Sequence, residues 1–141
     1  MMRQRFVVDT NVVFEGLTKK GGAADLIVQA WLARLFRPHL SNALAYEYVD
    51  VLSRKLSEPR WKTLQPILGT MLARAEFVTI HYSWRPSSPD PGDEHIVDCV
   101  MNSGSILITY NLRDFKPAQD ALGLVIWTPV EFVTMLARSD L

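Results

Sequence analysis

The segment Phe6-Val7-Val8-Asp9-Thr10-Asn11 joins a short apolar run to a carboxylate near the start of the chain. The run from Arg5 to Asp9 predicts a fully buried first strand, and Thr10 and Asn11 then start a brief helix. A carboxylate at such a junction often turns the chain and caps the helix that follows. Because it also lies beside a buried run, it must be hydrogen-bonded, paired or bound to a metal ion. Asp9 is therefore the first candidate metal ligand.

Alternating extended and helical patterns follow this segment, so the sequence predicts an α/β fold in a single domain over residues 1–141. Further strands are expected over 37–40, 77–82, 105–109 and 125–127, and helices over 23–36, about 42–56, about 61–75, 93–102 and from 129 onward. Residues 58–60 read as a break, and 83–91 as a loop rich in proline and serine. Such alternation implies a parallel sheet with ligands at the carboxyl ends of its strands.

Composition restricts the class of protein. Of the 141 residues 48% are apolar, which is enough for a real core and argues against disorder. Fifteen basic and fifteen acidic residues balance, which argues against a protein that holds nucleic acid by a global positive field. Cys99 is the single cysteine and is expected to be a core thiol, and the three histidines read as ordinary residues. No signal peptide or membrane span is visible, so a cytoplasmic protein without membrane attachment is expected.

Glu47 is a second candidate, because of its phase on the predicted helix that follows Ser41. On a helical wheel it lies at the border of the apolar face, beside Leu44 and Val51, whereas Asp50 points well away. A glutamate at such a border either reaches out to solvent or faces a pocket. The helical wheel alone leaves both interpretations open.

Asp93 is the third candidate and has a competing explanation. Asp90-Pro91-Gly92-Asp93 is typical of a capped helix start, with Asp90 as N-cap and proline at the first position. The helix dipole favours an anion there with or without a metal ion. Glu94 and Asp98 share a different face of the same helix and are expected to meet water.

Taken together, these segments resemble the PIN-domain ribonucleases. The resemblance is carried, in the expected order and spacing, by Val8-Asp9-Thr10-Asn11, Ser41 through Glu47, Asp90-Pro91-Gly92-Asp93-Glu94-His95 and Ile108-Thr109-Tyr110-Asn111-Leu112-Arg113-Asp114-Phe115. It is strongest to the toxin components of toxin–antitoxin systems that are related to the VapC toxins. The resemblance implies a Rossmann-like, three-layer α/β/α domain with a five-stranded parallel sheet. It also implies a metal-dependent endoribonuclease, an RNA substrate, an antitoxin protein as partner, and a homodimer.

By position, the resemblance implies that Asp9, Glu47 and Asp93 are the catalytic carboxylates and hold Mg²⁺ or Mn²⁺. The further residues that it places around the metal are Asn11, Thr109, Asn111 and Asp114. Where many members have Thr-x-Asp, this chain has Thr109-Tyr110-Asn111, and an amide oxygen coordinates Mg²⁺ without supplying charge. Candidates for contacts to the RNA backbone, which position a substrate without reading its sequence, are Arg60, Lys62, Arg85, Arg113 and Lys116.

Two other functions stay open from the sequence. Asn111 favours a PIN-like module that has lost effective catalysis and binds nucleic acid or a protein partner. A phosphatase or a phosphoacceptor receiver on a similar sheet is the second. It would need another acid near Asp9 and a lysine after a later strand, but Asn11 stands in place of the acid and Lys116 is the only nearby lysine.

Overall fold

Short parallel strands form the centre of the fold in the computed structural model, which describes residues 4–83 and 90–138. In one sheet β1 (Phe6–Val8), β4 (Ile106–Ile108) and β5 (Ile126–Trp127) pair in the order β1-β4-β5. In the other, β2 (His39–Leu40) pairs with β3 (Glu76–Phe77). β1 and β4 are buried along their whole length, as expected for strands covered on both faces.

The predicted single sheet of five strands is wrong for the described residues, because the five parallel strands divide into a sheet of three and a sheet of two. An isolated parallel bridge between Phe6 and Pro38 lies between β1 and β2. Proline has no N–H to donate to a strand ladder, so this single bridge is not extended into a longer ladder between β1 and β2. β3 is shorter than expected, although Val78 still donates to the carbonyl of Leu40 over 2.8 Å.

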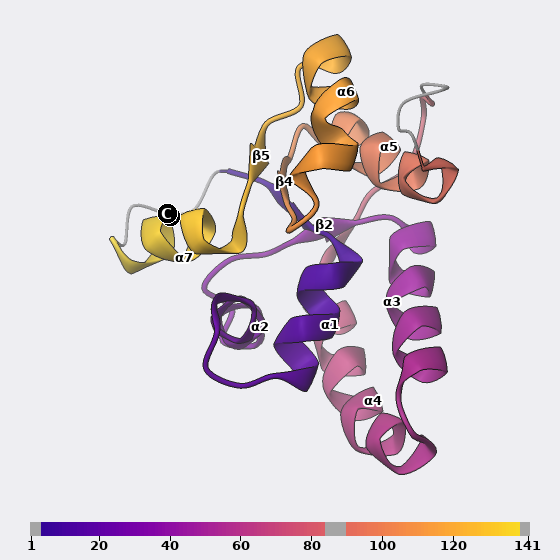
Figure 1. The fold of residues 1–141 in the computed structure, drawn as a ribbon, viewed down its shortest axis with the longest axis vertical. Helices are drawn as coiled ribbons and strands as arrows, with labels where there is room; N and C mark the ends of the chain where they lie inside the picture. Colours follow the sequence, from indigo (N-terminus) through magenta and orange to yellow (C-terminus); the bar gives the residue numbers. More distant parts are fainter. Residues whose placement is uncertain (1–3, 84–89, 139–141) are drawn as a thin grey trace.

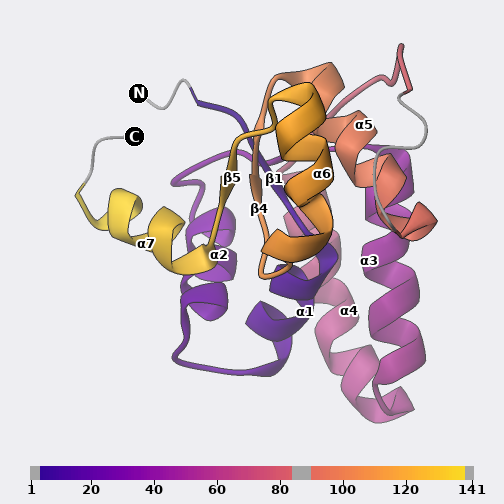
Figure 2. The same ribbon diagram turned by 45° about the horizontal axis from the view of Figure 1, so that its top comes forward.

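Two groups of helices enclose these strands. The helices are α1 (Thr10–Thr18), α2 (Ala23–Leu32), α3 (Asn42–Lys55), α4 (Glu58–Ala73), α5 (Glu94–Ser103), α6 (Leu112–Leu122) and α7 (Pro129–Ala137), with a 3₁₀ turn η1 (Pro91–Asp93) before α5. The strands lie between α5 and α6 above and α1 to α4 below (Figure 1), and the turned view shows α7 beside α2 (Figure 2). Within the segments that the structure describes, no helix is long and apolar enough to cross a membrane.

Side-chain caps fix where several helices begin. The hydroxyl of Ser41 accepts from the backbone N–H of Leu44 at the start of α3, as predicted. Ser57 caps α4 in the same way, and the helix then begins at Glu58. The predicted break at residues 58–60 is therefore wrong, because proline is tolerated in the first turn of a helix, where its missing N–H is not needed. α6 lies outside the elements predicted from the sequence.

Buried aromatic side chains connect the helices to the strands. The rings of Phe6, Phe36 and Phe132 pack against one another with centroids 4.8–6.2 Å apart. The indole N–H of Trp31 in α2 donates to the carbonyl of Met71 in α4 over 2.8 Å. Burying such large side chains while satisfying their polar atoms gives the core both hydrophobic and hydrogen-bond stabilisation.

Helices α1 and α2 approach each other so closely at Gly16 that no side chain fits between them. A Cβ atom at this position would lie 2.5 Å from the carbonyl oxygen of Ala24 and 2.5 Å from a methyl group of Val28. The backbone of α2 cannot yield as a flexible side chain could. Gly16 therefore fixes the distance between the helix that begins at Asp9 and the helix beside it.

Gly16→Ala should lower the free energy of unfolding by roughly 1–3 kcal/mol, because overpacking forces the two helices apart. Gly69→Ala in α4 is the matched control, since nothing lies within 4 Å of its added Cβ. The control should raise the stability by up to about 1 kcal/mol through helix propensity. Urea unfolding of both variants measures the difference, and equal effects of the two substitutions would contradict the close helix contact.

Candidate active site

An open pocket of about 540 Å³ lies at the carboxyl ends of β1 and β4. Its lining comes from four separate parts of the chain: α1 along its length, α3 from Glu47 to its end, the η1 turn with the residue before it, and the segment after β4. The sequence-predicted site residues that the structure brings into this lining are Asp9, Asn11, Glu47, Asp93 and Asn111. In an open parallel sheet this edge is where ligands bind.

Asp9 is held in one orientation at the end of β1. Its side chain is only 5% exposed. One carboxylate oxygen accepts from the backbone N–H of Thr10 over 2.7 Å, and the other accepts from the hydroxyl of Thr109 over 2.6 Å. Asp9 thus caps α1, one of its two sequence-based interpretations, and also lines the pocket. The cap leaves the carboxylate at the pocket wall, so the two roles coexist.

Glu47 reaches the same pocket from α3 and is positioned by two partners. The hydroxyl of Thr10 donates to one of its carboxylate oxygens, and Nε2 of His95 lies 3.0 Å from the other. The next residue, Tyr48, is fully buried and donates from its hydroxyl to the carbonyl of Val8. Because Val8 immediately precedes Asp9, this bond ties α3 to the end of β1 and places Glu47 near Asp9.

His95 contacts a candidate ligand, which its sequence position did not predict. It reads as an ordinary histidine, yet its imidazole lies against the carboxylate of Glu47, next to the pocket. The available signal was its place in the Asp90-Pro91-Gly92-Asp93-Glu94-His95 motif, two residues after a candidate ligand. The pairing with Glu47 spans 48 positions and is not visible in local sequence.

Asp93 ends the η1 turn, with one carboxylate oxygen left without a partner. Asp90 caps this turn by accepting from the N–H of Gly92 over 2.9 Å, as the sequence predicted. Oδ2 of Asp93 is buried and makes no hydrogen bond with any described residue. Buried polar atoms in folded proteins are nearly always satisfied, so such an oxygen calls for a ligand or an ion.

Thr109 and Asp114 support the pocket without lining it. Thr109 is fully buried, donates to Asp9 and accepts from the N–H of Asn111 over 2.9 Å. The amide of Asn111 caps α6 and donates to the carboxylate of Asp114 over 2.9 Å. The side chain of Asn111 therefore lines the pocket while its amide oxygen and nitrogen are both hydrogen-bonded to Asp114 in the first turn of α6.

Electrostatic repulsion accumulates in this pocket. Burial raises the pKa of Asp9 to about 6, with a further contribution from the charge of Glu47. Burial also raises the pKa of Asp93 to about 7, and the nearby charges of Asp9 and Asp90 add to that effect. Burial acts in the same direction on Glu47, but its hydrogen bonds from His95 and Thr10 outweigh burial and leave its pKa below the usual value.

The donor chemistry fits a hard divalent cation. All three candidate ligands offer carboxylate oxygens, two of them are strained by burial and like charge, and one oxygen of Asp93 is unsatisfied. Mg²⁺ and Mn²⁺ prefer oxygen ligands of this kind. In the described parts of the chain, however, no three His, Cys, Asp or Glu side chains are already grouped as a metal site. The carboxylates would therefore have to close around an ion.

Two sequence-based expectations for α5 are wrong. Glu94 and Asp98 were expected to meet water, but they are only 9% and 4% exposed. The hydroxyl of Ser83 lies 3.3 Å from the carboxylate of Asp98, so the segment before the loop helps to cover this face of the helix. Asp98 does not line the acidic pocket. Asp98 lies on a different face of α5 from Asp93, as predicted from the helical period, but that face is buried.

The basic residues nearest the pocket are not those that the sequence singles out. Lys19 and Lys55 line it, and Nζ of Lys55 lies 5.6 Å from the centre of the Phe14 ring. The described residues predicted to contact RNA are not part of the lining: Arg60 donates to the carbonyl of Thr18, which does line the pocket, Lys62 pairs with Glu58, Lys116 pairs with Asp120, and Arg113 is exposed on α6. Arg85 lies outside the described residues.

Parallel strands, flanking helices and an acidic pocket at the strand ends define an α/β domain whose candidate site lies at the sheet edge where such folds bind ligands. The sequence profile of the PIN domain matches residues 5–113, which is most of the chain, so the protein belongs to the PIN-domain family. The predicted membership of the PIN-domain family is confirmed. No curated protein sequence matches the chain significantly.

Solved structures with the same fold include those of VapBC and FitAcB. VapBC2 from Rickettsia felis, bound to a DNA fragment from its promoter, has 14% sequence identity and a TM-score of 0.65, over 89% of this chain and 98% of that chain. DNA-bound VapBC from Salmonella typhimurium has 17% identity and a TM-score of 0.64, over 90% and 99%. FitAcB from Neisseria gonorrhoeae has 16% identity and a TM-score of 0.59, over 89% and 98%. At these identities the similarity shows the shared fold.

The raised pKa of Asp9 predicts how stability depends on pH in chelator-treated protein. The unfolded chain ionises Asp9 near its ordinary pKa of 3.8, whereas the folded protein does so near 6. Stability is therefore lost as the pH rises from about 4 to about 7, by roughly 3 kcal/mol at most, since one pKa unit corresponds to about 1.4 kcal/mol. Asp93, with its pKa of about 7, acts in the same direction.

Thermal melts in chelator at about pH 5.5 and about pH 7.5 test this sign. Asp9→Asn removes one ionising group, so the variant should gain less stability on acidification than the wild type. Hydrogen bonds from His95 and Thr10 hold the pKa of Glu47 below its usual value, so Glu47 is not the group that this comparison follows. The interpretation is wrong if the two proteins show the same change in melting temperature between the two pH values.

Proposed function

We propose that the protein is a divalent-metal-dependent endoribonuclease that hydrolyses phosphodiester bonds of RNA at the acidic pocket. The observation that carries the proposal is the convergence of Asp9, Glu47 and Asp93 on one pocket. Two of these carboxyl groups are held at raised pKa values in a metal-free site. A site built only for stability would not collect like charges at this cost.

Each of the three carboxylates has a defined part in the proposed site. Asp9, Glu47 and Asp93 would hold Mg²⁺ or Mn²⁺, and the bound cation would neutralise the scissile phosphate and lower the pKa of the attacking water. Thr109 holds the carboxylate of Asp9 toward the pocket, and Thr10 with His95 holds that of Glu47. Asp93 keeps an oxygen free for a ligand. Lys19 and Lys55 at the pocket wall supply positive charge for the RNA backbone.

The biological setting that we propose is a toxin–antitoxin pair. The solved structures with this fold include VapBC and FitAcB. Their shared fold supports the proposal of an antitoxin protein as the partner of this chain, and we propose a homodimer as its assembly.

The metal-nuclease proposal predicts three linked effects of Asp9→Asn. Removing one of the crowded charges should stabilise the metal-free protein slightly. The same change should weaken the rise in melting temperature that Mn²⁺ gives by binding only the folded state. It should also abolish RNA cleavage. Thermal melts with and without millimolar Mn²⁺, beside a cleavage assay with and without chelator, measure all three.

Asp50→Asn is the matched control for this experiment. Asp50 lies on α3 near Glu47, but its carboxylate pairs with Arg54 over 3.2 Å outside the pocket. The control protein should keep both the Mn²⁺ response and the activity of the wild type. Full Mn²⁺ response and full cleavage by Asp9→Asn would remove the metal-nuclease proposal.

A catalytically weak PIN-like module that binds nucleic acid or protein is the second candidate function. It is favoured by Asn111, whose amide is used in contacts to Asp114, and by the absence of a ready-made metal cluster among the described residues. Asn111→Asp tests this candidate, because aspartate caps a helix as well as asparagine does and adds a charged ligand.

Under the nuclease proposal the wild type already cleaves RNA, and Asn111→Asp should raise its Mn²⁺ affinity by on the order of tenfold. Isothermal titration with Mn²⁺ and a cleavage assay measure the two effects, with Asn11→Asp as a second variant at the same pocket. If the wild type neither binds Mn²⁺ nor cleaves RNA while Asn111→Asp gains both, the weak module is the better account of the natural chain.

A further inference from the structure

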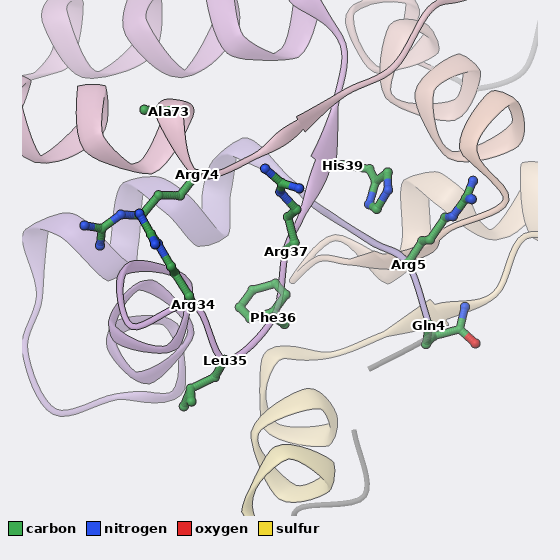
Figure 3. Close-up of a pocket in the computed structure, with 9 residues that line it drawn as sticks. All are labelled: Gln4, Arg5, Arg34, Leu35, Phe36, Arg37, His39, Ala73 and Arg74. Carbon is green, nitrogen blue, oxygen red and sulfur yellow. The ribbon is translucent and has the colours of Figure 1, made fainter. Parts of the chain in front are cut away.

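A second hollow, of about 650 Å³, lies at the opposite ends of the strands and is lined by arginine side chains. Arg5 precedes β1, Arg37 precedes β2, Arg34 follows α2 and Arg74 follows α4. Figure 3 shows Arg34 and Arg74 on one side of this hollow, Arg5 and His39 on the other, and the ring of Phe36 between them. We call Arg5, Arg34, Arg37, His39 and Arg74, together with the hollow they line, the basic groove.

The basic groove continues into a neighbouring hollow of about 410 Å³, because Arg5 and His39 line both. The second hollow adds His81, Phe77 and the side chain of Asn102. Phe77 is 47% exposed, so its ring is accessible to a ligand. Together the two hollows form an extended surface in which guanidinium groups alternate with aromatic and imidazole rings.

Positive charge dominates this surface. Among the described residues that line the two hollows, Glu76 is the only acid, and it pairs with Arg37 at 3.5 Å. Burial and the charge of Arg5 lower the pKa of His39, so this imidazole is neutral at neutral pH and leaves the charge to the arginines. The formal charge of the whole chain is zero, so the positive charge of this surface offsets negative charge that includes the carboxylates of the acidic pocket.

Stability explains two of the arginines but not the others. Arg74 donates to the carbonyl of Leu32 at the end of α2, and Arg5 donates to the carbonyl of Ser103 at the end of α5 over 3.1 Å. Basic side chains at helix carboxyl ends stabilise a protein in this way. Arg34 makes no hydrogen bond or ion pair through its side chain with another described residue. The salt bridge of Arg37 is more than half exposed and therefore contributes little stability.

Arg34 also has a backbone conformation that a basic side chain does not favour. Its φ is 61°, in the left-handed region that glycine adopts without strain. Among the described residues it is the only one other than glycine with a positive φ. Strain of this kind concentrates at functional positions, where a side chain is retained for a reason other than stability.

We propose that the basic groove binds the phosphate backbone of single-stranded RNA at a distance from the acidic pocket. Guanidinium groups recognise phosphate by paired hydrogen bonds. The rings of His39, Phe77 and His81 offer faces on which unpaired bases stack, an element that a site for an acidic peptide does not need. The choice of RNA as the polyanion rests on the proposed ribonuclease function, and the groove would anchor the strand that the acidic pocket itself repels.

Binding is measured without cleavage, so that failure of the groove and failure of the nuclease proposal are distinguishable. Every protein carries Asp9→Asn and is kept in chelator. The probe is a fluorescently labelled, mixed-sequence single-stranded RNA of about 16 nucleotides, titrated by anisotropy at several salt concentrations. Arg34→Gly removes the guanidinium and relieves the backbone strain, and Arg37→Ala removes a second exposed guanidinium. Lys20→Ala, an exposed lysine at the other end of α2, is the control for a general loss of charge.

We expect the protein with both arginine changes to bind the RNA at least roughly fivefold more weakly at low salt than the Lys20→Ala control. The slope of log affinity against log salt should fall by about 0.7 for each phosphate contact removed. The melting temperature of Arg34→Gly should be unchanged or raised, because glycine adopts the positive φ freely. A purely structural role for Arg34 predicts the reverse pattern: a lower melting temperature and unchanged binding.

Two results would overturn the proposal. The first is an affinity and salt slope that stay the same, or that change equally in Lys20→Ala. The second concerns the class of partner: a poly-glutamate peptide that binds the unsubstituted groove more tightly than the RNA, and loses that binding with the same two substitutions, would assign the groove to an acidic peptide instead.

Discussion

The buried carboxylate of Asp9 is the constraint on which the rest of the structure depends. A charged group at the end of a buried strand has to be hydrogen-bonded from several directions, and its partners come from α1 and from the end of β4. Tyr48 adds a bond from α3 to the carbonyl of Val8. Three segments far apart in sequence are thereby fixed around one side chain, and the pocket is the space between them. The contacts that position the site are therefore also contacts that hold the strands and helices together.

The charges of the chain are segregated along the strands. Carboxylates collect where β1 and β4 end, and arginines collect where β1 and β2 begin. The net charge of the chain does not reveal this separation, because acidic and basic residues are equal in number. An acidic pocket repels a polyanion until a cation enters, so the RNA binding that we propose would require affinity from other surfaces. The basic groove and the lysines at the wall of the acidic pocket carry the positive charge that this proposal needs.

Local signals in the sequence were enough for the strand before Asp9, the caps of α3 and of η1, and the family. These features depend on neighbouring residues, so a linear pattern reports them. Features that depend on distant packing were missed: the contact of His95 with Glu47, the burial of Asp98, and the division of the strands into two sheets beside Pro38. The sequence marks Pro38 as a weak point in a strand, but whether the neighbouring strand still pairs there depends on the backbone on both sides.

The difference between local signals and distant packing also explains why Asp9 and Asp93 can each be both a helix cap and a candidate metal ligand. A helix start presents free backbone N–H groups and a positive dipole end, so a carboxylate is favoured there whatever its function. Placing ligands at such positions lets the helix dipole offset part of the repulsion among them. At Asp93 this offset is incomplete, since its pKa remains raised and one oxygen remains unsatisfied. The imbalance that remains is what a divalent cation, and not a further hydrogen bond, is suited to remove.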